Sequence, residues 1–74
     1  MQKLKIRTGH NGFYDQANCN RMALLEEGQQ LQMVKELPDN KYICKIVNPS
    51  EACKFHGGYH GMVVEAYVQN LEVV

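Results

Sequence analysis

A chain of 74 residues carries eight basic and eight acidic side chains, so its formal net charge at pH 7 is zero. This balance excludes the broad electrostatic attraction by which non-specific nucleic-acid binders act. A domain of this length buries only roughly 60–65% of the surface of its unfolded chain, which predicts a single compact domain over residues 1–74. Apolar runs of a few residues predict neither a membrane span nor a secretory signal, and three cysteines fit a reducing compartment. We therefore expect a soluble, cytoplasmic protein without a cofactor.

The N-terminal third of the sequence predicts one strand followed by a long loop. Residues 2–7, QKLKIR, alternate charged and aliphatic side chains with the period of two that is typical of a strand with one buried face. Residues 8–20, TGHNGFYDQANCN, are rich in the Gly, Asn and Asp that turn a chain, so we expect a long loop anchored by Phe13 and Tyr14. Residues 21–28, RMALLEEG, are compatible with a single helical turn that ends by Gly28.

The middle third predicts a β-hairpin. Residues 29–37, QQLQMVKEL, and residues 41–47, KYICKIV, are strongly β-prone. Between them Pro38 favours a turn by fixing φ, and Asp39 and Asn40 are residues that close one. Cys44 lies in an apolar run and is interpreted as a small buried side chain.

The C-terminal third predicts a second long loop and two more strands. Residues 48–61 hold Pro49, three glycines and few apolar anchors. Residues 62–74 predict a short strand, a single helical turn around Ala66 to Val68, and a final strand. Five short strands separated by turn signals favour an all-β fold, a small antiparallel barrel whose closure protects the strand edges.

The order of these segments resembles the Src-homology-3 domain over about residues 12–71. In that family an ALYDY segment opens the first long loop, a glycine-containing hydrophobic segment forms the second strand, a tryptophan pair starts the third, and G-x-F-P-x-N-Y-V closes the barrel. The corresponding segments here are GFYDQ, ALLEEGQQLQMV, KYICKI and GMVVEAYVQNLEV. The resemblance implies a five-stranded antiparallel Src-homology-3-like barrel with two long loops and a single helical turn near the C-terminus.

The family binds proline-rich segments in slots between aromatic side chains. Tyr14 and Tyr67 match two such positions, but Lys41 replaces the first tryptophan, Val64 the groove proline and Gln16 the second ALYDY tyrosine. Recognition of proline-rich peptides is therefore not expected. We expect the partner to contact the tyrosine face and the second loop, through Tyr14, Tyr42, Phe55, Tyr59 and Tyr67. Tyr42 is in register with Cys44 and Ile46 on one face of its strand, so a place in the core is an alternative for this residue.

The stretch CKFHGGYHG spaces Cys53, His56 and His60 like half of a zinc site. The second half is missing, because only His10, Cys19 and Cys44 remain, each alone. If the resemblance holds, the stretch occupies the distal hairpin, across the barrel from His10 and Cys19. We expect a solvated loop, and a zinc-binding domain through Cys53, His56 and His60 stays as an alternative.

A second alternative is a small barrel that binds single-stranded nucleic acid. Lysines and aromatic rings together are the combination that such proteins use. The neutral charge argues against it, and alternating lysines also discourage pairing at a strand edge. The candidate residues are Lys3, Lys5, Arg7, Lys41 and Lys45.

No catalytic arrangement is recognisable in the sequence, so no enzyme is expected. There is no Ser-His-Asp set, and Glu26 with Glu27 resembles a solvated turn more than an acid–base pair. The expected function is a stand-alone protein-binding module that occupies a surface on a larger protein as an inhibitor, adaptor or modulator. Small free-standing proteins of this kind are common in phage and bacterial genomes, which suggests such an origin by analogy.

Overall fold

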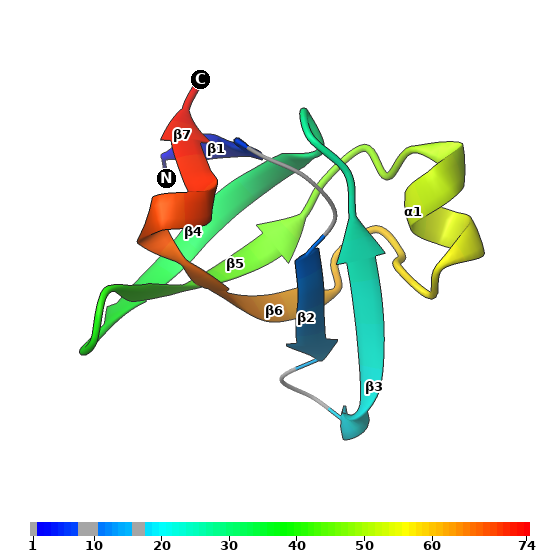
Figure 1. Cartoon of the computed structure of the whole chain (residues 1–74), viewed down its shortest axis with the longest axis horizontal. Helices are drawn as coiled ribbons and strands as arrows, with labels where there is room; N and C mark the ends of the chain where they lie inside the picture. Colours follow the sequence, from blue (N-terminus) through cyan, green and yellow to red (C-terminus); the bar gives the residue numbers. More distant parts are fainter. Residues whose placement is uncertain (1, 8–10, 16–17) are drawn as a thin grey trace.

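The computed structural model describes residues 2–7, 11–15 and 18–74, and the side chains of residues 2–7 and 24–74. This part of the chain is built mainly from strands (Figure 1). The strands are β1 (Lys3–Ile6), β2 (Asn11–Asp15), β3 (Asn18–Leu25), β4 (Gln30–Leu37), β5 (Lys41–Ile46), β6 (Val63–Tyr67) and β7 (Leu71–Val73). Helix α1 (Glu51–Phe55) lies between β5 and β6, and the 3-10 turn η1 (Val68–Asn70) precedes β7. The predicted all-β class is confirmed.

All these strands belong to one antiparallel sheet with the order β3-β2-β6-β5-β4-β1-β7. The sheet curls around a single core, as in a small barrel (Figure 1). Strands β1 and β7 lie side by side at one end of the order, with Leu4 opposite Val73. Strand β3 forms the other end and pairs with β2. The predicted strand over residues 2–7 and the predicted hairpin are confirmed as β1 and as β4 with β5.

The alternation read from the sequence determines which side chains enter the core. Leu4 and Ile6 are buried, whereas Lys3 and Lys5 face outward. Directly opposite residues of an antiparallel pair share a face, so Gln32, which lies opposite Lys3, also faces outward. Cys44 is fully buried, as predicted. The buried apolar side chains are Leu4, Ile6, Leu25, Leu31, Cys44, Ile46, Cys53, Met62, Val64, Ala66 and Leu71.

The turn between β4 and β5 forms where Pro38, Asp39 and Asn40 predicted it. Asp39 and Asn40 have φ angles of 65° and 58°, in the left-handed region that these two residue types tolerate. One feature of β4 was not predicted, a register shift between Met33 and Lys35. The shift leaves Val34 as the extra residue of a bulge, and its side chain is 45% exposed.

The first long connection differs from its prediction. The prediction of an irregular loop over residues 8–20 is wrong for the described residues, because β2 and β3 pair as a hairpin with Phe13 opposite Ala23. The helical turn considered over residues 21–28 is also wrong, since β3 continues to Leu25. Gly, Asn and Asp favour turns locally, but a hairpin satisfies the backbone N–H and C=O groups that a loop would leave to water. The strand count therefore exceeds the five that were expected.

The second long connection, between β5 and β6, is present but is not irregular throughout, because it contains α1. The helical turn near the C-terminus is confirmed as η1, which begins at Val68, within the segment where it was expected. Within the described part of the chain, no helix has the length and apolar character needed to cross a membrane.

Candidate functional site

Helix α1 begins at a serine cap. The Ser50 side-chain oxygen accepts a hydrogen bond from the Cys53 backbone N–H at 3.1 Å, and Ser50 itself is extended. Glu51 in the first turn and Lys54 in the last are placed favourably for the helix dipole, and their charged groups are 3.6 Å apart. Gly57, with φ of 96°, follows the helix end. The cap and the acidic first turn were the available sequence signals for α1, but five residues are too few to show helical periodicity.

Gln29 fixes the start of this connection to the turn before β4. Its side chain is only 5% exposed, and sequence reasoning did not single it out. The amide nitrogen donates to the carbonyl oxygens of Val47 at 3.0 Å and Asn48 at 3.3 Å. The amide oxygen accepts from the Ser50 backbone N–H at 3.1 Å. One buried amide thus satisfies three backbone groups just before α1, which restricts the position of the helix.

Ile46 closes the far end of the same connection. Its N–H donates to the Met62 carbonyl oxygen at 2.9 Å, and its own carbonyl oxygen accepts from the Gly61 N–H at 2.8 Å. Between these ends, Cys53 is fully buried in the core, and its carbonyl oxygen accepts from the Gly58 N–H at 2.8 Å. The connection is therefore attached to the barrel at both ends and in the middle.

Exposed aromatic side chains lie at the C-terminal end of α1 and in the residues just after it. We call Phe55, His56, Tyr59 and His60 the α1 surface. Phe55 is 85% exposed and Tyr59 is 39% exposed, and both histidines are exposed. The rings of Phe55 and His56 meet edge to face with centroids 5.1 Å apart. The sequence predicted Phe55 and Tyr59 as partner-binding residues, and the structure brings them to one loop.

The structure separates the cysteine of the zinc alternative from its histidines. The Cys53 side chain lies in the core, whereas His56 and His60 are exposed. No group of three or more potential metal ligands occurs among the described side chains. His10 lies outside the described residues, and the side chain of Cys19 is not described.

The predicted tyrosine face is not a single surface. Tyr42 is partly buried and packs against the core, which is the core position left open by its alternation with Cys44. Tyr67 is 50% exposed at the end of the β5–β6 hairpin that lies away from α1, with the Lys41 ammonium 5.4 Å from its ring centroid. The Tyr14 side chain and residue Gln16 lie outside the description, and Val64, at the groove-proline position, is fully buried.

Lysines gather on the outward face of β7, β1, β4, β5 and β6. We call this the basic face. Its members follow from the register, in which Lys3 lies opposite Gln32, Gln32 opposite Lys45, and Lys35 opposite Ile43. Four of the five residues proposed for nucleic-acid binding are thus brought to one face, and Arg7 is exposed just after β1. The lysines of the basic face are Lys3, Lys5, Lys35, Lys41 and Lys45.

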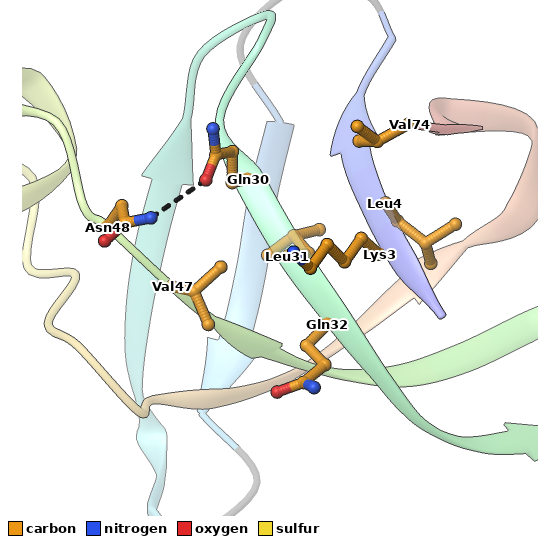
Figure 2. Close-up of a pocket in the computed structure, with 8 residues that line it drawn as sticks. All are labelled: Lys3, Leu4, Gln30, Leu31, Gln32, Val47, Asn48 and Val74. Atoms are coloured by element: carbon orange, nitrogen blue, oxygen red, sulfur yellow. Dashed lines mark hydrogen bonds between the residues drawn. The ribbon is translucent and has the colours of Figure 1, made fainter. Parts of the chain in front are cut away.

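A hollow of about 300 Å³ lies on the basic face beside β1 and β4. Figure 2 shows the Lys3 side chain lying over β4, with Gln30 on one side and Gln32 on the other. The Gln30 amide oxygen accepts a hydrogen bond from the Asn48 side chain at 3.0 Å (Figure 2). The residues that line the hollow are Lys3, Leu4, Gln30, Leu31, Gln32, Val47, Asn48 and Val74.

The two cysteines with described side chains are buried thiols. Burial raises the pKa of Cys44 to about 11. Burial, and secondly the negative charge of Glu26, raise the pKa of Cys53. Both thiols therefore hold their protons at neutral pH, and a protonated buried thiol is a poor nucleophile and metal ligand.

The geometry thus offers two surfaces, the α1 surface and the basic face. The first is aromatic and projects from the barrel on a capped helix, and the second is charged and follows the sheet. Comparison with protein-family models, with curated proteins and with solved structures finds no protein or family that matches this chain.

Proposed function

We propose that this chain is a non-catalytic protein-binding module that uses the α1 surface to occupy a site on a larger protein. The observation that carries the proposal is the contrast within one five-residue helix, where Cys53 is fully buried and Phe55 is 85% exposed. A helix fixed by its buried side presents the Phe55 ring to solvent in a restricted position. Bound in this way, the module would act as an inhibitor, adaptor or modulator of its partner, as in small phage or bacterial regulators.

Covering the exposed Phe55 ring with a partner would be favourable. Burying a phenylalanine side chain stabilises a protein or complex by roughly 1.5–3 kcal/mol, and aromatic residues dominate the energy of many interfaces. Tyr59 adds a second, partly exposed ring close to Phe55 in the sequence. Because the connection is already attached through Gln29 and Ile46, binding would require little further ordering of the backbone.

Two observations support the absence of catalysis as part of this proposal. The pKa values of Cys44 and Cys53 are both raised, so neither thiol is activated as a nucleophile at neutral pH. The side chains that line the hollow on the basic face are one lysine, amides and aliphatic groups, with no histidine, aspartate or glutamate side chain among them.

We further propose that the barrel is of the Src-homology-3 type without that family's ligand specificity. Strands β1, β4, β5, β6 and β7 follow the expected order, with a long connection before β4, a tight turn before β5 and a helical turn before β7. Val64, at the groove-proline position, is buried, and Lys41 lies against Tyr67 where a tryptophan is expected. A proline-rich peptide should therefore leave the amide NMR spectrum unchanged, and shifts around Tyr67 would show that the groove still binds.

The α1 surface can be tested by affinity capture from an extract of the source organism. The bait is the parent chain or Phe55→Ala, and the matched control is Val34→Ala, which removes another exposed apolar side chain on the β4 bulge. We expect at least one protein to be retained by the parent and the control and lost with Phe55→Ala. Truncating an anchor of this kind typically weakens binding by about 2 kcal/mol or more.

Folding must be scored in parallel, by circular dichroism and the thermal midpoint. Phe55→Ala should keep both, because the ring makes few contacts that folding would bury. Tyr59→Ala and Tyr67→Ala compare the contributions of the two ends of the barrel to binding. We expect Tyr59→Ala to weaken capture more than Tyr67→Ala does. If Phe55→Ala captures every protein that the parent captures, the α1 surface is not the binding site.

A further inference from the structure

Charge is distributed unevenly over this neutral chain. Five lysines and two glutamates, Glu65 and Glu72, face outward from β7, β1, β4, β5 and β6, which gives the strands of the basic face a formal charge of +3. The whole chain has a formal charge of zero. The excess of positive charge on one sheet face is therefore balanced by acidic residues elsewhere. Such a face attracts anionic partners although the molecule as a whole does not.

Two of the lysines on this face are already paired. The Lys5 ammonium lies 3.0 Å from a Glu72 carboxylate oxygen, and the Lys41 ammonium lies 3.8 Å from a Glu65 carboxylate oxygen. Lys3, Lys35 and Lys45 form no ion pair within the described part of the chain. An additional anion would therefore bind most readily near these three.

Lys3 and Lys45 stand on either side of Gln32. Each of them pairs in register with that residue, Lys3 from β1 and Lys45 from β5. Neighbouring strands are about 4.8 Å apart, so the two lysine backbones are separated by about 10 Å. This spacing matches two acidic side chains carried on one extended segment that crosses β4.

The hollow beside Lys3 supplies hydrogen-bond donors for a carboxylate. The Lys3 side chain reaches over β4 between Gln30 and Gln32 (Figure 2). Gln30 uses its amide oxygen for Asn48, so a bound carboxylate would accept from the Gln30 amide nitrogen. An ammonium and two amide nitrogens can together donate several hydrogen bonds to one carboxylate, and charge-assisted hydrogen bonds are the strong ones. Val47 and Val74 provide aliphatic walls for the methylene groups that carry the carboxylate.

The composition of the basic face favours an acidic protein segment over single-stranded nucleic acid. Single-strand binders place aromatic rings where bases stack. The aromatic side chain described on this face is Tyr67, and the Lys41 ammonium already lies 5.4 Å from the centroid of its ring. The remaining apolar side chains on the face are aliphatic, namely Leu37, Ile43, Val47, Val63 and Val74.

We infer that the basic face binds an acidic segment of a protein partner, with one carboxylate held in the hollow by Lys3, Gln30 and Gln32 and a second by Lys45. This surface is separate from the α1 surface, so the inference goes beyond the proposed function and does not depend on it.

The test uses a fluorescein-labelled peptide of Glu-Glu-Leu repeats, with the same peptide carrying Gln in place of Glu and a labelled oligothymidylate as the other probes. Binding is measured by fluorescence anisotropy at about 0.15 M salt, where long-range surface electrostatics are largely screened. The acidic peptide should bind and the Gln peptide should not. The double variant Lys3→Gln, Lys45→Gln should weaken binding by about tenfold or more.

Lys54→Gln is the matched control, because it removes one exposed lysine on α1 and should leave binding unchanged. Nitrogen-15 NMR of the parent chain gives a second measurement that needs no variant. The peptide should shift the backbone amides of β1, β4 and β5 and the side-chain amides of Gln30 and Gln32. Absence of peptide binding, equal weakening by Lys54→Gln, or shifts confined to other strands would overturn the inference. Tighter binding of oligothymidylate, lost in the double variant, would overturn it in favour of nucleic acid.

Discussion

The Gly58 N–H donates a hydrogen bond to the Cys53 carbonyl oxygen at 2.8 Å, and the same glycine lies directly against the Cys53 sulfur. A Cβ at position 58 would overlap Sγ and would come within 3.0 Å of the Cys53 carbonyl oxygen. Gly28, Gly57 and Gly61 have positive φ angles, but Gly58 does not. Glycine is therefore required at position 58 because of the limited space and not because of the backbone conformation. The backbone can therefore pack against the buried Cys53 thiol at position 58 because glycine has no side chain.

Gly58→Ala should therefore destabilise the fold by about 2 kcal/mol, because overpacking a tight site typically costs 1–3 kcal/mol. The free energy of unfolding from urea titration measures this. In a Cys53→Ala background the same change should cost about 1 kcal/mol less, since the overlapping sulfur is gone. Strictly additive free energies in the double variant would show that Cys53 is not the obstacle.

Gln29→Met should destabilise the fold by about 2–3 kcal/mol. Methionine has a similar volume, but it leaves the Val47 and Asn48 carbonyl oxygens and the Ser50 N–H without their partner, and each unsatisfied buried group costs about 1–3 kcal/mol unless water reaches it. Gln69→Met, at an exposed position on η1, is the control and should change stability by less than about 0.5 kcal/mol. Equal stability of the two variants would mean that the Gln29 hydrogen bonds contribute nothing to the fold.

Stability should decrease as the pH rises from about 9 to about 11. Burial raises the pKa of Cys44 from its ordinary 9.0 to about 11, so the folded chain keeps a proton that the unfolded chain has lost. The stabilisation from this proton is fully present below pH 9 and is lost as the pH approaches the folded pKa. It is on the order of 2 kcal/mol for Cys44. Urea titrations at pH 8 and pH 10.5 should show a smaller decrease for Cys44→Ala, and an identical decrease would mean that Cys44 does not titrate with folding.

Chelator should leave the thermal midpoint unchanged. Cys53 is buried away from His56 and His60, so zinc binding by these three residues would require the core to open. A structural zinc would contribute on the order of 10 kcal/mol to folding. If EDTA abolished the folded signal of the parent chain, if zinc restored it, and if His56→Ala showed no such response, the structure would be contradicted.

The sequence predicted the elements whose signals are local. Alternation in QKLKIR and the turn residues Pro38, Asp39 and Asn40 predicted β1 and the β4–β5 hairpin, and the apolar run around Cys44 predicted that this residue would be buried. The sequence also named four of the five lysines of the basic face. It missed Lys35, which shares that face only because the bulge at Val34 shifts the register of β4.

The elements that were missed depend on partners far along the chain. Strand β2 is specified by its pairing with β3, so that Phe13 meets Ala23, and nothing in either segment alone indicates the partner. Gln29 reaches carbonyl groups 18 and 19 residues away, and a polar residue beside a glycine turn gives no sign of such a contact. The bulge at Val34 is equally silent in the sequence, because no glycine or proline marks it.

In the β5–β6 connection, the residues that hold the connection to the barrel differ from the residues that it exposes to solvent. The backbone groups used by Gln29 end at Ser50, and the hydrogen bonds of Ile46 resume at Gly61, so the ends of the intervening ten residues are fixed by the barrel itself. Loop-closure entropy grows only slowly with length. Segments of other lengths could therefore be grafted between these two points, provided that one apolar side chain still fills the place of Cys53. The barrel could therefore serve as a scaffold for other binding loops at this position without a change in the sheet.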